Sequence, residues 1–247
     1  MLPIRSTRLR IVQEVVLTAL CAALYAVLGY ASYLGIFTPA IGVVRFWPSV
    51  FIPAVFAIAF GPRVGGIGAA IGIFISDMLI HGNALLSLSV GVPSNFTCFY
   101  IVGLLARRLK GTIKPILIGI LEETVILLTV ISCYMHGLLS SEVAIAYIIG
   151  MSITIAFTLA YALIKGKKYS GLILACNTGL FIGATIIGIG VYAFSQFFTL
   201  PTGEKNLPIG AALLWMLWVY VTEIPFMISL SPPIVEIISK IFMRSEE

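Results

Sequence analysis

Six polar or aromatic residues in the N-terminal half of the sequence could together bind a small polar molecule. Asp77 and His81 are four residues apart, so they share one face if the helix that carries Asp77 continues to His81. Charged groups and amides can form ion pairs and hydrogen bonds with a ligand, and an indole can stack on a heterocycle. The predicted binding residues are Arg45, Trp47, Asp77, His81, Asn83 and Asn95. A structural alternative is equally open, in which Arg45 pairs with Asp77 and both residues only join the loops.

Three glutamates lie in apolar surroundings. Glu122 and Glu123 are adjacent in one hydrophobic segment, and Glu223 comes shortly before Pro225 in another. A charged residue at the centre of a membrane helix costs about 2.5–3.5 kcal/mol on insertion scales, so each of the three calls for a partner or a function. A structural role and an ion-coupling role both stay open for them.

An intramembrane protease of the prenyl-protein-processing type is the enzyme alternative, because its signature begins with adjacent glutamates. That signature continues EExxxR, whereas position 127 here is Leu127, and its later FxxxH has Ser132 where His136 would need Phe. We therefore expect no enzyme and no catalytic residue. No cofactor or metal is expected either, because the four cysteines lie in apolar stretches without CxxC spacing. They are Cys21, Cys98, Cys133 and Cys176.

The composition identifies the class of protein that must position these residues. Of the 247 residues, 60% are hydrophobic and 10% are charged, and the mean hydropathy is +1.11. Soluble domains are about 45–50% apolar and about 25% charged. Disorder requires low hydrophobicity and high net charge. The chain is therefore predicted to be an all-α, polytopic membrane protein in the lipid bilayer. Its net charge of +5 does not indicate a nucleic-acid partner.

Eight hydrophobic segments are candidate membrane spans in this single integral membrane domain. A bilayer core about 30 Å thick needs roughly 20 helical residues, so residues 48–60 are too short to cross alone and must be shielded by neighbours or extended. A tail over 231–247 has amphipathic spacing and is expected at the cytoplasmic interface. The candidate spans are 11–31, 48–60, 64–80, 93–106, 114–136, 143–164, 171–197 and 208–230.

The positions of Lys and Arg predict how the spans are oriented. With eight spans, all Lys and Arg residues except Arg45 and Lys205 fall on one side. Because cytoplasmic loops carry an excess of Lys and Arg, both termini are expected in the cytoplasm of a plasma-membrane protein. The loops at 32–47, 81–92, 137–142 and 198–207 are then outside.

Small residues line one face of the first predicted helix. Two overlapping AxxxA pairs, Ala19/Ala23 and Ala22/Ala26, allow another helix to approach closely, either within the chain or on a partner. The sequence also lacks GxxxxGK[ST] and has no room for an ATP-binding domain. Uphill transport would therefore draw on an ion gradient or on a separate ATPase.

A block of the N-terminal region resembles a known family. It consists of the run from Arg45 to Pro53, the sequence AFGPRVG at 59–65, and a glycine-rich helix that ends at Ser76-Asp77. Together with the alanine-rich first helix, this block, roughly residues 12–108, resembles the substrate-binding S components of energy-coupling factor (ECF) transporters. Members of that family usually have six helices, whereas eight segments are counted here.

The resemblance implies a function and its partners. S components capture a vitamin or similar micronutrient under their outer loops and associate with a coupling membrane subunit and two ABC ATPases. It also implies that Ala19, Ala22, Ala23 and Ala26 contact the coupling subunit. The main alternative is a standalone secondary transporter that couples to protons through Asp77, Glu122 or Glu223. Such transporters often contain inverted repeats, and no repeat is evident here.

Overall fold

The computed structural model describes residues 7–36, 46–109 and 111–244, and this part of the chain is helical and contains no strand. Arg45 lies outside the described residues. Short π- and 3-10 segments occur at Ser32–Ile36, Pro48–Val50 and Ser87–Gly91. The α-helices are α1 (Thr7–Ala31), α2 (Phe51–Ala59), α3 (Pro62–Ile80), α4 (Ala84–Leu86), α5 (Val92–Arg108), α6 (Lys114–Met135), α7 (Ser141–Phe197) and α8 (Gly210–Arg244).

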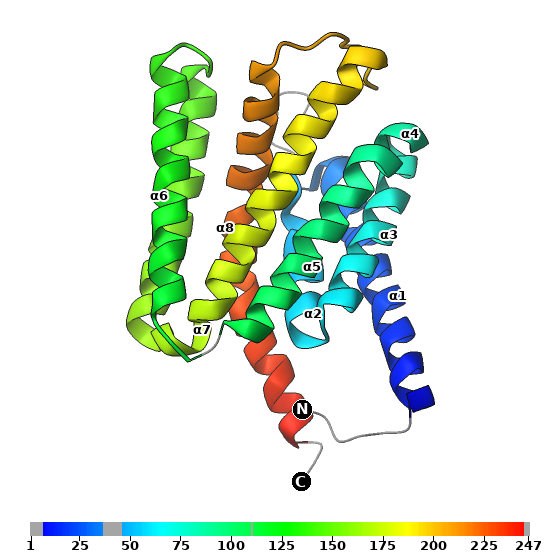
Figure 1. Ribbon diagram of the computed structural model, residues 1–247, viewed down its shortest axis with the longest axis vertical. Helices are drawn as coiled ribbons and strands as arrows, with labels where there is room; N and C mark the ends of the chain where they lie inside the picture. The colour runs from blue at the N-terminus through cyan, green and yellow to red at the C-terminus, as the bar shows by residue number, and fades with distance from the viewer. Residues whose placement is uncertain (1–6, 37–45, 110, 245–247) are drawn as a thin grey trace.

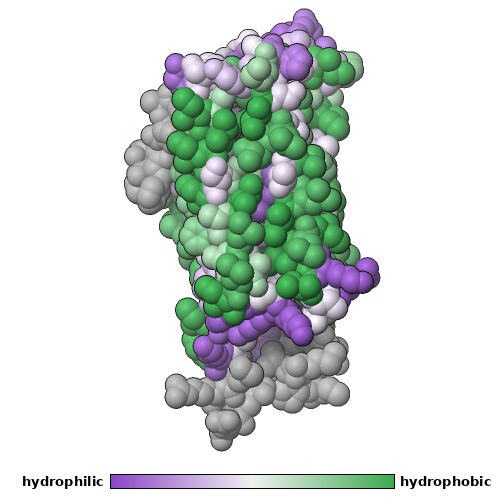
Figure 2. Space-filling model, turned by 90° about the vertical axis from the view of Figure 1, so that its left-hand side faces the viewer, coloured by the Kyte–Doolittle hydropathy of each residue, from purple (hydrophilic) through white to green (hydrophobic). Residues whose placement is uncertain are grey.

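The prediction of an all-helical membrane protein is confirmed. Six helices of the described chain are long and apolar enough to cross a membrane. Figure 2 shows a broad hydrophobic band between two more polar ends on one face of the molecule. Such a band matches the apolar core of a bilayer.

Helix α7 explains why six long helices accommodate more than six hydrophobic segments. Its backbone is non-helical at Lys165, with φ −142° and ψ 32°. In Figure 1 the chain reverses its direction there, so the two arms of α7, residues 141–164 and 166–197, run in opposite directions. These arms cover the separate segments expected at 143–164 and 171–197. That each segment crosses the bilayer stays a prediction.

The arms of α7 have different neighbours. Figure 1 shows the first arm beside α6, where the two form a hairpin at one side of the molecule. The second arm lies in the main bundle, where α7 contacts α5 and α8. On the other side of the bundle, α3 packs against both α1 and α5.

The short helix α2 is enclosed by protein. It contacts α3, α5 and α8, and the side chains from Ile52 to Ala57 are buried. A helix of this length is tolerated because neighbouring helices, rather than lipid, surround its central part. This is the shielding that its length requires.

Glycines allow α3 to approach its neighbours closely. A Cβ added to Gly65 would lie 2.3 Å from the Cβ and 2.6 Å from the Cα of Ala57 in α2. A Cβ on Gly72 would lie 2.9 Å from the carbonyl oxygen of Ala22 in α1. Backbone atoms are therefore in contact at both crossings, as in other membrane helix pairs built on small residues.

Replacing Gly65 with alanine should lower the free energy of unfolding by about 1–3 kcal/mol, the usual cost of overpacking a close contact. Thermal unfolding can be followed with a thiol-reactive dye, because all four cysteines are buried. Gly210→Ala is the matched control, since no atom lies within 4 Å of the added Cβ. Equal unfolding temperatures for the two variants would contradict the close contact between α2 and α3.

One end of the bundle is rich in lysine and arginine and is called the basic end below. It carries Arg63, Arg107, Arg108, Lys114, Lys165, Lys168 and Lys240. Helices α1 and α8 have their outer termini at this end, so the two ends of the described chain lie on the same side (Figure 1). This arrangement agrees with the sorting of charges in the sequence, and its cytoplasmic orientation stays a prediction.

A charge cluster fixes α8 to the bend in α7 at the basic end. The Glu236 carboxylate accepts from the Nζ atoms of Lys165 at 2.8 Å, Lys168 at 3.0 Å and Lys240 at 3.2 Å. It also accepts a hydrogen bond from the Tyr169 hydroxyl. Helix α8 continues through Pro232 and Pro233 to Arg244, so the tail expected from residue 231 onward is helical as far as Arg244. Its place at the cytoplasmic interface stays a prediction.

Candidate functional site

A cavity of about 380 Å³ lies in the half of the bundle away from the basic end. Its walls come from α1, α3, α5, the second arm of α7, α8 and the loop at 200–202. Pockets for small organic ligands are about 300–1,000 Å³, mostly apolar, with a few polar groups that orient the ligand. The polar and aromatic groups in the wall are Tyr25, Tyr33, Trp47, Asp77, His81, Ser94, Asn95, Cys98, Phe99, Thr202, Trp215 and Glu223.

One wall of the cavity carries a buried carboxylate beside an imidazole. The Asp77 Oδ1 atom lies 3.5 Å from Nε2 of His81, and Oδ2 accepts a hydrogen bond of 2.7 Å from the Ser87 hydroxyl. The His81 Nδ1 atom accepts a 3.0 Å hydrogen bond from the backbone N–H of Asn83. Because Nδ1 accepts, the ring hydrogen is assigned to Nε2, which points it toward Asp77.

A second polar group in the cavity wall is Asn95, which is hydrogen-bonded to a tyrosine that is fixed by aromatic packing. The Tyr25 hydroxyl donates to Oδ1 of Asn95 at 2.7 Å, and Nδ2 of Asn95 donates to the Gly91 carbonyl at 3.0 Å. The Tyr25 ring packs edge-on against Trp47 and Phe99, with ring centroids 6.2 and 6.1 Å away. Gly91 ends the π-helical turn at 87–91, a kind of distortion that is frequent at functional sites.

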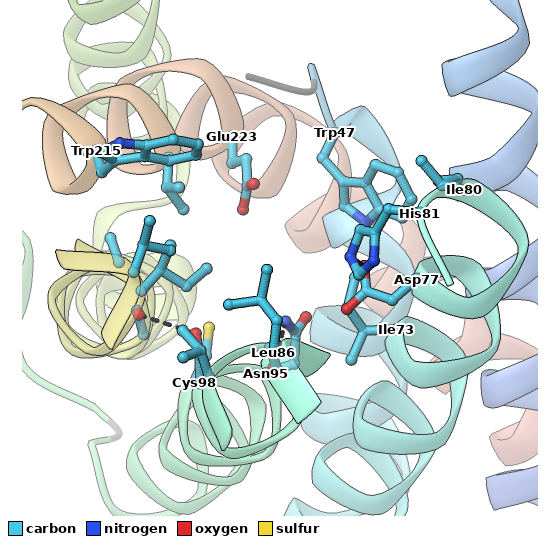
Figure 3. A pocket seen from close by; sticks show the side chains of 18 of the residues that line it. Trp47, Ile73, Asp77, Ile80, His81, Leu86, Asn95, Cys98, Trp215 and Glu223 are labelled. Carbon is cyan, nitrogen blue, oxygen red and sulfur yellow. Dashed lines mark hydrogen bonds and ion pairs between the residues drawn. The ribbon is translucent and has the colours of Figure 1, made fainter. Parts of the chain in front are cut away.

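Helix α8 supplies the opposite wall. Figure 3 shows Trp215 and Glu223 extending from α8 into the cavity, across from Trp47, His81 and Asp77. Glu223 is buried, and within the described residues it makes no hydrogen bond or ion pair. The cavity therefore has indoles on two sides and carboxyl groups on two sides.

The structure brings together four of the six predicted binding residues, and Trp47, Asp77, His81 and Asn95 all line the cavity. Asn83 does not line it. Its side chain instead caps α4, where Oδ1 accepts from the Leu86 N–H at 3.0 Å. A direct contact of Asn83 with a ligand stays a prediction. Arg45, as noted above, is not described.

The sequence reasoning missed the contribution of α8. Trp215, Val219 and Glu223 are spaced four residues apart, and all three line the cavity. This spacing places them on one helical face. From the sequence alone, this spacing could have predicted a polar and aromatic stripe in the last span.

The alanines of α1 divide between two faces. Ala22 and Ala26 are only 4% and 5% exposed, and Gly72 of α3 lies against the backbone of Ala22. Ala19 and Ala23 are exposed. Ala22 and Ala26 are thus buried within the chain, and the contact of the α1 alanines with a partner stays a prediction.

Comparison with known protein families identifies the family of this chain. A sequence model of the family described as "ECF-type riboflavin transporter, S component" matches residues 10–176. The chain belongs to this family. The match confirms the resemblance and extends it through α6 and the first arm of α7. No curated protein and no solved structure matches the chain.

Membership of the S component family makes the chain part of a transporter and not an enzyme. S components work with a substrate and with an ECF module of membrane and ATPase subunits. The match ends before most of the second arm of α7 and all of α8. Trp215 and Glu223 therefore belong to a part of the cavity wall that the family match does not cover.

Proposed function

We propose that this chain captures riboflavin or a closely related flavin in the cavity and presents it to an ECF module for uptake. The observation that carries the proposal is a cavity walled by Trp47 and Trp215 in a chain whose family is described by riboflavin transport. A coupling membrane subunit and two ABC ATPases would supply the energy, since the chain has no phosphate-binding loop.

The chemistry of the cavity suits a flavin. The isoalloxazine is a planar, aromatic ring system, and indole rings offer large flat surfaces for stacking on it. The ribityl chain and the ring imide carry O–H and N–H donors. Asp77 and Glu223 are acceptors, and Asn95 offers both a donor and an acceptor. Buried acceptors of this kind select for ligands that can pair with them.

The position of the cavity suits uptake. It lies away from the basic end, and the positive-inside rule assigns the basic end to the cytoplasm. The ligand would then enter from the outer side and leave inward only after the chain has docked on the coupling subunit.

The outward-facing alanines Ala19 and Ala23 are the proposed docking surface. They are exposed on α1 beside Leu20 and Leu24, whose side chains are also exposed. Small residues let a partner helix come close to the backbone of α1, which is how helices associate in lipid. Ala22 and Ala26 support this surface from behind by packing α1 on α3.

Titration of riboflavin against the purified chain tests the proposal. We expect saturable quenching of flavin fluorescence at one ligand per chain, because stacking on an indole quenches the flavin. Thiamine and biotin serve as non-flavin vitamins and should not compete. Saturable binding of one of these, with none of riboflavin, would overturn the assignment of the ligand but not the family.

The tryptophans provide a matched pair of variants for the same titration. The chain has three tryptophans, of which Trp47 and Trp215 line the cavity and Trp218 does not. Trp215→Phe should weaken riboflavin affinity about three- to tenfold, in line with about 0.5–1.5 kcal/mol for an aromatic pair. Trp218→Phe should leave the affinity unchanged. Equal affinities for both variants would remove Trp215 from the binding site.

A further inference from the structure

A second buried polar cluster lies between α6, α7 and α8, and none of its residues lines the cavity. Glu123 of α6 is fully buried. Its Oε1 atom accepts two hydrogen bonds of 2.8 Å, one from the Thr158 hydroxyl in the first arm of α7 and one from Nδ2 of Asn177 in the second arm. The carboxyl group thus joins the α6–α7 hairpin to the main bundle.

Four oxygen atoms in this cluster are buried without a hydrogen-bond partner in the described part of the chain. They are Oε2 of Glu123, Oε1 of Glu122, Oδ1 of Asn177 and the hydroxyl of Tyr220. The other oxygen of Glu122 lies 3.4 Å from the Thr178 hydroxyl, next to Asn177 in sequence. Tyr220 lies within range of electrostatic interaction with both glutamates. Buried polar atoms are almost always paired, so this set needs an explanation.

The cluster has more unpaired acceptor atoms than hydrogen-bond donors or positive charges to pair with them. Glu123, Glu122 and Asn177 contribute three acceptor atoms, and Tyr220 can donate one hydrogen. Within the described residues, no Lys, Arg or His forms an ion pair or hydrogen bond with either glutamate. The remaining titratable neighbour is the Cys176 thiol, which interacts with Tyr220. A buried carboxylate without a positive partner is very costly, so something from outside the chain must supply the charge.

We propose that Glu122, Glu123, Asn177 and Tyr220 form a buried site for one monovalent cation, a proton or Na⁺. All four groups present oxygen atoms, which are the ligands of hard cations. Four protein oxygens are too few for Ca²⁺, which takes six to eight, and Mg²⁺ demands octahedral coordination with several waters, which four buried oxygen atoms do not provide. The described residues also contain no group of three or more His, Cys, Asp or Glu that could hold a metal ion.

Because of the position of the site, a bound cation would stabilise the contact between helices. Asn177 and Tyr220 belong to the second arm of α7 and to α8, the helices that also supply Leu180 and Glu223 to the cavity wall. A cation that binds only the folded arrangement stabilises the contact of the α6–α7 hairpin with these two helices. The site does not depend on the identity of the ligand in the cavity.

Binding of ²²Na⁺ to the full-length chain in lipid nanodiscs tests the Na⁺ form, with choline as the balancing cation. Saturable binding of one Na⁺ per chain is expected to be lost in Glu123→Gln, because the amide brings its own hydrogens and removes the charge. Glu142→Gln is the matched control, since Glu142 is exposed at the start of α7 in the same hairpin, and its binding should be unchanged.

Infrared spectroscopy on the same samples tests the proton form. If Na⁺ does not bind, a protonated-carboxyl C=O band at neutral pH should be present, lost in Glu123→Gln and retained in Glu142→Gln. Tyr220→Phe serves as a second variant if Glu123→Gln does not fold. It should weaken Na⁺ binding about tenfold or shift the carboxyl band, because one partner is removed. Absence of both Na⁺ binding and a band that responds to these variants would overturn the site.

Discussion

Replacing Ala23 with tryptophan should abolish uptake by the assembled transporter while leaving the riboflavin affinity of the isolated chain unchanged. Ala23 is exposed on α1 and takes no part in the cavity wall. An indole at this position would hold a partner helix away from the α1 backbone, and close backbone approach is what small residues provide in membranes. A loss of about 1.4 kcal/mol of docking energy already weakens assembly tenfold. The measurement is flavin uptake into proteoliposomes that contain the complete transporter.

Ala156→Trp is the control for this prediction. Ala156 is also an exposed alanine in a long hydrophobic helix, but it lies on the α6–α7 hairpin rather than on α1. The variant should transport as the unmodified chain does. Normal uptake by Ala23→Trp would show that docking uses another surface, and uptake without any ATPase would instead favour a standalone secondary transporter.

The class of fold was predictable because it follows from bulk composition. Hydrophobic runs can be counted from the sequence, and the structure has helix over every candidate span. The reversal at Lys165 was also predictable, because 143–164 and 171–197 were expected as separate spans with lysines between them. What could not be predicted is which helices each arm of α7 packs against. Local sequence marks where polar residues interrupt an apolar run, but the neighbours of the next helix depend on tertiary packing.

Only the part of the candidate site that lies opposite α8 was predictable from the sequence. Asp77 and His81 were placed together by their four-residue spacing, and Trp47 and Asn95 were located near the same outer loops. Glu223 was recognised as an acid in an apolar helix, yet nothing in its own segment shows which other helices it faces. Such long-range placement, here of α8 across the cavity from α3, depends on the packing of the whole bundle.

The alanines of α1 show the same limit at the level of a single helix. Ala19/Ala23 and Ala22/Ala26 are equivalent as sequence patterns, and both permit close helix packing. Only the structure shows that Ala22 and Ala26 meet α3, whereas Ala19 and Ala23 face outward. Hydrophobicity does not distinguish the two faces, because lipid and protein interior are equally apolar.

Replacing Glu223 with leucine should weaken riboflavin binding and, at the same time, stabilise the empty chain. Glu223 is buried against the cavity and has no hydrogen-bond or ion-pair partner among the described residues. A hydrogen bond to a charged group contributes about 1.5–3 kcal/mol, so its loss should lower the affinity about 10- to 150-fold. An apolar side chain of similar size also removes the cost of an unpaired buried polar group, on the order of 1 kcal/mol. Flavin titration and thermal unfolding measure the two effects.

The opposite signs of these effects separate a ligand-binding role of Glu223 from a structural one. A glutamate that held helices together would lower both affinity and stability when replaced, because its partners would be left unpaired. Glu142→Gln, at an exposed position, should change neither quantity. A fall in the unfolding temperature of Glu223→Leu would therefore contradict the binding role, whereas a rise accompanied by weaker binding indicates a carboxyl group kept for the substrate at the expense of stability.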